Sequence, residues 1–181
     1  MRDRFGSPTI FLHWFMLALL GAVYACIELR TFWPKGSDLR ELLKTWHFML
    51  GLSVFALVWI RLYARFRGGT PPIVPAPPAW QMRFGHAMHL ALYLLMICMP
   101  IAGWLILSAK GKPIPFYGLE LPPLIATDKP LAEQIEEIHE TVGTIGYWLI
   151  GLHAAASLFH HYVQRDNTLA RMWMRRSTTG G

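Results

Sequence analysis

The chain has 181 residues, of which 54% are hydrophobic, and a formal net charge of +6 at pH 7. This charge does not favour a nucleic-acid partner, because the basic residues flank apolar blocks, as in membrane proteins, and form no single stripe. The two cysteines, Cys26 and Cys98, lie inside apolar blocks, where small buried thiols are common.

Four apolar segments predict four membrane-spanning helices. We expect them at about 8–29, 43–66, 84–108 and 136–163, within a single domain that covers 1–181. Each has about 20 residues or more, the length that a helix needs to cross a hydrocarbon core of about 30 Å. The sequence therefore predicts an all-α integral membrane protein, built as a four-helix bundle in membrane lipid.

The first two helices have recognisable ends. Ser7-Pro8 is typical of a helix start, and the first segment is longer than the core of a signal peptide, so we expect it to stay in the protein. Ser37 or Asp38 can cap the second helix, Gly68-Gly69 ends it, and the prolines of 70–78 indicate a stiff linker.

The second half of the chain predicts two more helices around a loop. We expect the third helix from about Arg83 to Ser108 and a long, irregular loop over 110–130. The fourth helix is expected to begin near Leu131, after a cap at Thr127 or Asp128, and to continue past Val163.

Charge predicts the orientation of the four helices. The N-terminal segment, the 61–83 region and the C-terminal tail share one side and carry ten arginines, against seven basic residues on the other side. Because basic residues collect on the cytoplasmic side, we expect both termini in the cytoplasm.

The histidines are the strongest functional signal. One histidine in a span can be an ordinary hydrogen-bonded residue, but ionisable side chains there are rare and usually functional. Seven of the eight lie in or at the edge of the apolar segments: His13, His47, His86, His89, His139, His153 and His160.

Helix geometry predicts how four of these histidines pair. His139 and His153 are 14 residues apart, about 21 Å along one face of a helix. His47 lies where the second helix enters from outside, level with His139. His13 lies where the first helix enters from inside, level with His153.

Two stacked histidine pairs between helices are what two b-type haems with bis-histidine ligation require. Zinc prefers four ligands at one point, and the two layers are too far apart to share an ion. The chain has no Cys-x-x-Cys-His signature, which excludes covalent attachment. We therefore expect two non-covalent haem b groups.

Three further residues are candidates for haem contacts. Gly51 and Gly143 follow His47 and His139 by four residues, on the same helix faces, and can let a porphyrin lie against the backbone. Packing between helices explains these glycines equally well. Arg61 is level with the inner pair and can bind a haem propionate, or it can simply reach the cytoplasmic interface.

The remaining histidines gather near the inner pair. His86, His89 and His160 can donate hydrogen bonds and protons to a quinone carbonyl, although they can also face lipid headgroups. For His161 we favour the headgroups.

Short strings along essentially the whole chain carry a family resemblance. They are Ile10-Phe11-Leu12-His13-Trp14, Trp46-His47-Phe48-Met49-Leu50-Gly51, Thr70-Pro71-Pro72-Ile73-Val74-Pro75, His139-Glu140-Thr141, Gly151-Leu152-His153-Ala154-Ala155-Ala156, His160-His161-Tyr162 and Asp166-Asn167-Thr168-Leu169. In these strings the chain resembles the bacterial di-haem cytochrome b561 family. The resemblance implies a bacterial inner-membrane protein whose axial haem ligands match His13, His47, His139 and His153.

The resemblance also implies an activity. Similar proteins oxidise superoxide at the periplasmic face and reduce ubiquinone near the inner haem, with His160 at the quinone. A patch of Lys44, Lys110, Lys112 and Lys129 can attract an anion to the outer side. Two alternatives stay open: a haem subunit that carries electrons for a dehydrogenase, a hydrogenase or a periplasmic cytochrome, and a haem-free helical protein.

Overall fold

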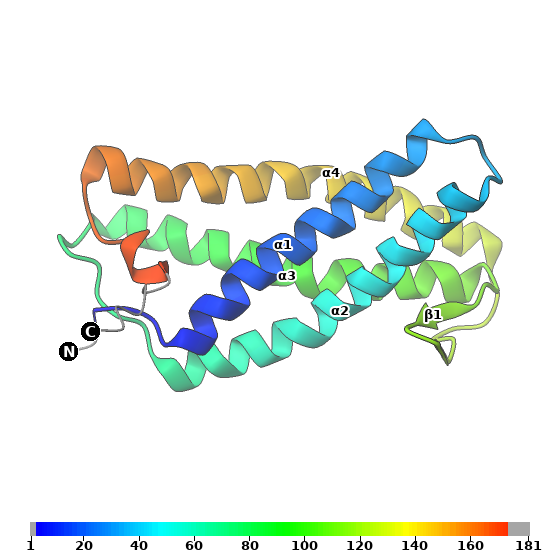
Figure 1. Cartoon of the computed structure of the whole chain (residues 1–181), viewed down its shortest axis with the longest axis horizontal. Helices are drawn as coiled ribbons and strands as arrows, with labels where there is room; N and C mark the ends of the chain where they lie inside the picture. Colours follow the sequence, from blue (N-terminus) through cyan, green and yellow to red (C-terminus); the bar gives the residue numbers. More distant parts are fainter. Residues whose placement is uncertain (1–2, 174–181) are drawn as a thin grey trace, which may run out of the picture.

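Four long helices form an elongated bundle in the computed structural model, which describes residues 3–173 (Figure 1). They are α1 (Ser7–Leu29), α2 (Asp38–Gly68), α3 (Ala79–Ala109) and α4 (Lys129–Phe159). All four are long and apolar enough to cross a membrane. The predicted fold class, an all-α integral membrane four-helix bundle, is confirmed. The membrane boundaries within these helices stay a prediction.

One helix end differs from the one expected. α3 begins at Ala79, directly after Pro78, and not near Arg83. The first turn of α3 is more polar than its apolar run, so hydropathy placed the start too late. At the other end of the chain, α4 ends at Phe159 as an α-helix, and helical structure continues past Val163, as expected, through a π-helical turn, η2 (His160–Gln164). α4 starts as expected, with the Asp128 side chain accepting from the Leu131 amide at 3.1 Å.

The segment between α3 and α4 contains a β-hairpin that the sequence analysis missed. Its strands, β1 (Ile114–Phe116) and β2 (Leu119–Leu121), pair antiparallel. Tyr117 and Gly118 form the turn, both with positive φ, which is the backbone that tight two-residue hairpin turns need. Three-residue strands beside prolines carry almost no periodic signal, so the expectation of an irregular loop was wrong there.

The helices pack as two layers joined at one side. α1 packs on α2, α3 packs on α4, and α2 joins the layers through α3. Met16, Val54, Val58 and Met96 form a buried core between α1, α2 and α3. By contrast, α4 has few close backbone contacts with α1 or α2. The space between α4 and these helices is therefore wider than in a tightly packed bundle, where axes are about 8–10 Å apart.

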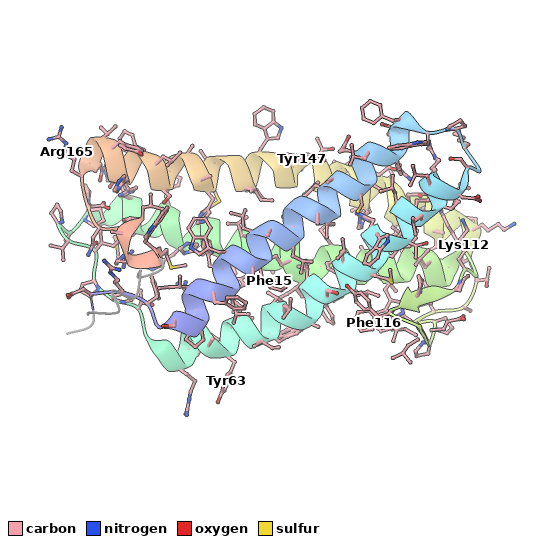
Figure 2. All side chains as sticks on the ribbon, viewed as in Figure 1. Phe15, Tyr63, Lys112, Phe116, Tyr147 and Arg165 are labelled. Carbon is pink, nitrogen blue, oxygen red and sulfur yellow. The ribbon has the colours of Figure 1, made fainter. Side chains whose placement is uncertain are left out.

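Apolar side chains cover the outside of the bundle. Trp148 and Phe66 are 78% and 81% exposed, and many other large apolar residues on the four helices are exposed as well. Charged side chains such as Lys112 and Arg165 lie at the two ends of the long axis (Figure 2). An apolar belt between polar ends is the surface that a bilayer solvates.

The two ends of the bundle are built differently. At one end, which we call the terminal end, the Phe5 amide donates to the Arg171 carbonyl at 3.2 Å and the Trp14 indole donates to the Met172 carbonyl at 2.8 Å. These bonds bring both ends of the described chain together. We call the opposite end the hairpin end, because β1 and β2 lie there (Figure 1).

Candidate functional site

The structure places His47 of α2 beside His139 of α4, near the hairpin end. Their ring centres are 6.4 Å apart and the rings are inclined by 75°. Two imidazoles on one metal ion, each bonded at about 2 Å, have ring centres about 6 Å apart. The pair therefore has the spacing of two ligands on opposite sides of one iron.

His47 is also held in the right tautomer for ligation. Its Nδ1 lies 3.0 Å from the Val23 carbonyl, which can only accept, so Nδ1 carries the proton. The lone pair of Nε2 is then free for a metal, which is how metal-binding histidines are commonly oriented. A residue that the sequence analysis overlooked, Gly103 of α3, faces His139: a Cβ at Gly103 would lie 3.7 Å from the His139 Cε1 atom.

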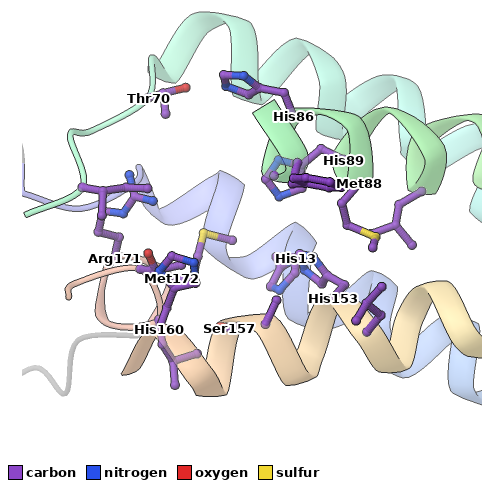
Figure 3. Close-up of a pocket in the computed structure, with 18 of the residues that line it drawn as sticks. His13, Thr70, His86, Met88, His89, His153, Ser157, His160, Arg171 and Met172 are labelled. Carbon is purple, nitrogen blue, oxygen red and sulfur yellow. The ribbon is translucent and has the colours of Figure 1, made fainter. Parts of the chain in front are cut away.

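A second histidine pair lies toward the terminal end. The ring centres of His13 on α1 and His153 on α4 are 6.2 Å apart, which again fits one shared metal ion. His89 of α3 joins them, with its ring centre 5.5 Å from that of His153. The structure thus brings the expected partners together and adds His89 as a second neighbour of His153 (Figure 3).

Arg61 lies beside this pair, and not all of its hydrogen-bond donors have a partner among the described residues. Its Nη2 lies 3.0 Å from His13 Nδ1, and its Nη1 is buried without a hydrogen-bond partner in the described part of the chain. A guanidinium only donates, so His13 accepts at Nδ1 here and its Nε2 carries the proton. His13 fits as a metal ligand through Nε2 once Arg61 turns to another acceptor, such as a haem propionate.

The glycines expected to cradle a porphyrin have room around them. A Cβ at Gly51 would meet nothing within 4 Å, and one at Gly143 would meet only the end of Met99, at 3.6 Å. Tight helix packing does not explain either glycine. Gly146 is the glycine of α4 that packs closely, against Tyr24 and Leu95.

A cavity of about 850 Å³ adjoins the pair at the terminal end. This is within the usual range of ligand pockets, about 300–1,000 Å³. Among the described residues, no carboxylate lines it. Its lining includes three arginines and five histidines, namely Arg61, Arg65, Arg171, His13, His86, His89, His153 and His160. Figure 3 shows His13, His89 and His153 toward one side of it, and Thr70, Arg171 and His160 toward the other.

The three histidines expected near a quinone have different surroundings. His86 and His160 line the cavity away from the His13–His153 pair, whereas His89 touches that pair. His160 is also bonded to Asp166, with 2.5 Å between Nδ1 and Oδ2. Asp166 belongs to one of the strings that carry the family resemblance, but its contact with His160 was not expected from the sequence.

The lysines at the hairpin end are partly neutralised. Lys44 pairs with Glu41 and Lys110 pairs with Glu136, each with an N–O distance of 2.6 Å. Ion pairs of this kind cancel much of the field that would attract an anion from a distance. Lys112 and Lys129 form no ion pair with any described residue.

Helical spans with paired histidines between them define a membrane electron-transfer protein. Comparison with known families narrows this class: the family model for prokaryotic cytochrome b561 matches residues 4–175. The chain is 41% identical to cytochrome b561 homolog 1 of Escherichia coli K12, over 96% of this chain and 99% of the relative. It is 36% identical to the probable superoxide oxidase CybB of Yersinia pestis, over 95% and 97%. Cytochrome b561 homolog 2 of Escherichia coli K12 is 27% identical, over 99% and 96%.

The chain belongs to the prokaryotic cytochrome b561 family. It is a bacterial membrane protein of electron transport, and the family carries b-type haem, generally two groups. The residues present fit that cofactor, because each histidine pair has the spacing of two axial ligands and lies across the wide space beside α4. The unpartnered Arg61 Nη1 offers a donor to a propionate.

Proposed function

We propose that this protein is a superoxide:quinone oxidoreductase with two haems. In this proposal, electrons enter from superoxide at the hairpin end and leave to ubiquinone in the cavity at the terminal end. The observation that carries the proposal is the order of three features along the bundle. From the hairpin end to the terminal end, these are the His47–His139 pair, the His13–His153 pair and the cavity that adjoins this second pair. Two superoxide anions become two O₂, and one ubiquinone takes up two electrons and two protons.

Each part of the chain has a defined task in this mechanism. His47 and His139 would hold the haem nearer the hairpin end, and His13 and His153 the haem nearer the terminal end. Haem iron, held in this way, supplies the one-electron chemistry. Arg61 would donate to a propionate, while Gly51 and Gly143 leave space beside the histidines. The buried cluster of Met16, Val54, Val58 and Met96 holds α1, α2 and α3 together.

His160 is the residue that we assign to the quinone oxygen, and His86 of α3 also lines the cavity. Histidine can donate a hydrogen bond to a carbonyl and release a proton near neutral pH. His89 is better placed to orient or support the inner pair than to reach a quinone, since its ring is 5.5 Å from His153.

The chain orientation completes the proposal. The positive-inside rule favours the arginine-rich terminal end in the cytoplasm, so both termini would lie there and the hairpin end in the periplasm. The probable superoxide oxidase among the relatives supports superoxide as the donor. The four helical spans support insertion in the bacterial inner membrane.

A second function is favoured by the ion pairs of Lys44 and Lys110. Because these pairs weaken an anion-attracting patch, the donor at the hairpin end can instead be a protein. The chain would then be a haem subunit for a dehydrogenase, a hydrogenase or a periplasmic cytochrome.

Stopped-flow spectroscopy on the purified protein in detergent separates these functions. Oxidised protein is mixed with superoxide, with and without superoxide dismutase, and haem reduction is followed at the b-type α-band. We expect reduction that outpaces spontaneous disproportionation, that the dismutase abolishes, and that added ubiquinone reverses. Haem reduction no faster than disproportionation would exclude superoxide as the donor and favour the protein-partner function.

A further inference from the structure

The chain changes its path sharply where α4 reaches the cavity. At His160 the α-helix becomes the π-helical turn η2, and Arg165 follows with φ 57°, a left-handed backbone that is uncommon outside glycine. The Asp166 amide then donates back to the His160 carbonyl at 3.1 Å. Single π turns often occur at functional sites. Here the turn returns Asp166 to the side of His160, six residues earlier in the chain.

Asp166 is a buried carboxylate whose two oxygens both have donors. Oδ2 lies 2.5 Å from His160 Nδ1, and Oδ1 accepts from the Thr168 amide at 2.8 Å. The residue is only 6% exposed. Burial raises the pKa of the Asp166 carboxyl, but the hydrogen bonds from His160 and Thr168 outweigh burial and hold that pKa below its ordinary value. Asp166 is therefore an anion at neutral pH.

This bond fixes which nitrogen of His160 serves the cavity. With Nδ1 donating to Asp166, Nε2 is the ring nitrogen left for a ligand, and His160 lines the cavity. A buried carboxylate in this position holds an imidazole in one orientation and stabilises its protonated form, as in hydrolytic triads. Protonated His160 would present an N–H donor from Nε2.

Basic residues line the same cavity as His160. Arg65 of α2, Arg171 of η3 (Ala170–Met172) and His86 of α3 line the same cavity. His161 is the neighbouring titratable group on η2 itself. Asp166 is the buried anion that offsets these basic groups.

The segment that carries Asp166 is anchored at several points. The Asn167 amide donates to the Val74 carbonyl at 3.1 Å, and the Val74 amide donates to Asn167 Oδ1 at 2.9 Å. Arg171 donates to the Pro71 carbonyl, and the Arg171 amide donates to the Asn167 carbonyl at 2.9 Å. A catalytic group held this firmly needs little rearrangement when the substrate arrives.

We propose that Asp166 is a positioning residue that keeps His160 oriented and protonated, so that His160 delivers a proton to the quinone oxygen as the quinone is reduced. This inference rests on the proposed quinone reduction. The Nε2–H bond of His160 breaks and an O–H bond forms on the quinone. The two electrons come through the inner pair, and water at the terminal end supplies the second proton and then reprotonates His160.

The test compares the wild type with Asp166→Asn, His160→Gln and the double variant. Chemically reduced protein is mixed anaerobically with short-chain ubiquinone, and haem reoxidation is followed from pH 5.5 to pH 9. Asn keeps the size of the side chain but not its charge. We expect Asp166→Asn to slow reoxidation about tenfold or more at pH 8 and less at pH 5.5, where free protons can still charge His160. The pH at which the rate falls should move to lower values.

Two comparisons separate positioning from a merely structural role. The double variant should be no slower than His160→Gln alone, because Asp166 acts through His160. Asn167→Ala, which removes the side-chain bond to Val74 but leaves the Asp166–His160 contact, should keep the wild-type pH profile. Fully additive losses, or the same shift in Asn167→Ala, would overturn the inference.

Three further results separate a failure of this inference from a failure of the proposed function. If Asp166→Asn loses its haems, His160→Gln carries the test, and persistence of the pH-dependent fall in that variant would overturn the inference. If wild-type reoxidation does not depend on quinone, the proposed function fails. If it does depend on quinone but Asp166→Asn matches the wild type in rate and pH profile, only the role of Asp166 fails.

Discussion

At the scale of single residues, hydrogen bonds decide which histidines can bind a metal. His47 donates from Nδ1 to a backbone carbonyl and keeps Nε2 free, whereas His13 accepts from Arg61. Around the terminal-end pair, His153 has two histidine neighbours, at 6.2 Å and 5.5 Å between ring centres. Chain topology favours His13 as the partner of His153, and the longer distance fits a shared iron better.

Alanine variants of His13 and His89 test which of these two residues binds the same iron as His153. His13→Ala should remove one of the two haems, because an iron at His153 would lose its second axial ligand. His89→Ala should keep both, and serves as the matched control since His89 also lies beside His153. Haem content is measured by pyridine haemochrome analysis. Loss of a haem in His89→Ala alone would assign the ligand to α3.

The depressed pKa of the Asp166 carboxyl predicts a pH-dependent contribution to stability. A carboxyl whose folded pKa lies below its ordinary value of 3.8 stabilises the fold above that value and stops doing so as the pH falls through the folded pKa. At pH 7 we expect Asp166→Asn to be less stable by about 1–3 kcal/mol, the range for buried hydrogen bonds to a charged group. Thermal unfolding in detergent, followed by circular dichroism, measures the difference.

The same comparison at low pH is the control. The gap between the wild type and Asp166→Asn should narrow below pH 3.8 and close as the carboxyl protonates. A gap that is equally wide at pH 7 and pH 3 would show that the charge of Asp166 contributes nothing to folding.

At the scale of helices, α4 organises both histidine pairs. It carries His139 and His153 on one face, opposite α2 and α1, and most of its close backbone contacts are with α3. α3 supplies no residue to the expected ligand set, yet it approaches the hairpin-end pair through Gly103. Gly103 thus lets the backbone of α3 lie close to His139.

Gly103→Val tests this dependence. A valine methyl group would extend beyond the Cβ position that already lies 3.7 Å from His139, so His139 should turn and the haem at the hairpin end should be lost or displaced. Gly151→Val on α4 is the control, because a Cβ there would meet nothing within 4 Å. Absorption spectra of both reduced variants provide the measurement. A normal two-haem spectrum in Gly103→Val would contradict the role of this contact.

The sequence predicted the helices well because apolar runs of membrane length have few alternatives. The spacing of His139 and His153 also predicted the two layers, since helix geometry converts 14 residues into depth. The structure places the members of each expected pair side by side, while haem binding by them stays a prediction. The Asp166–His160 bond was missed, because it needs the π turn and the left-handed Arg165, and neither has a sequence pattern.

At the scale of the whole molecule, charge and chemistry are divided between two ends. The terminal end has the cavity, its arginines and the anchored 166–173 segment, and the hairpin end has paired lysines beside a small β-hairpin. An apolar surface separates them. This polarity suits a protein that accepts electrons on one side of a bilayer and delivers them near the other.

The proposed orientation predicts the outcome of reporter fusions. Green fluorescent protein fused after residue 181 should fluoresce, and alkaline phosphatase fused there should be inactive, because both termini would lie in the cytoplasm. Phosphatase inserted in the β1–β2 turn, at Gly118, should be active. The opposite pattern would place the cavity at the periplasmic side and reverse the proposed direction of electron flow.

The number of haems per chain tests the central claim most directly. In the proposed arrangement, the two separate histidine pairs would hold two haem b groups per polypeptide. Pyridine haemochrome analysis of pure, fully loaded protein, with the polypeptide quantified independently, should give a ratio of two. A ratio of one, or none, would contradict the account, because one of the two pairs would then hold no haem.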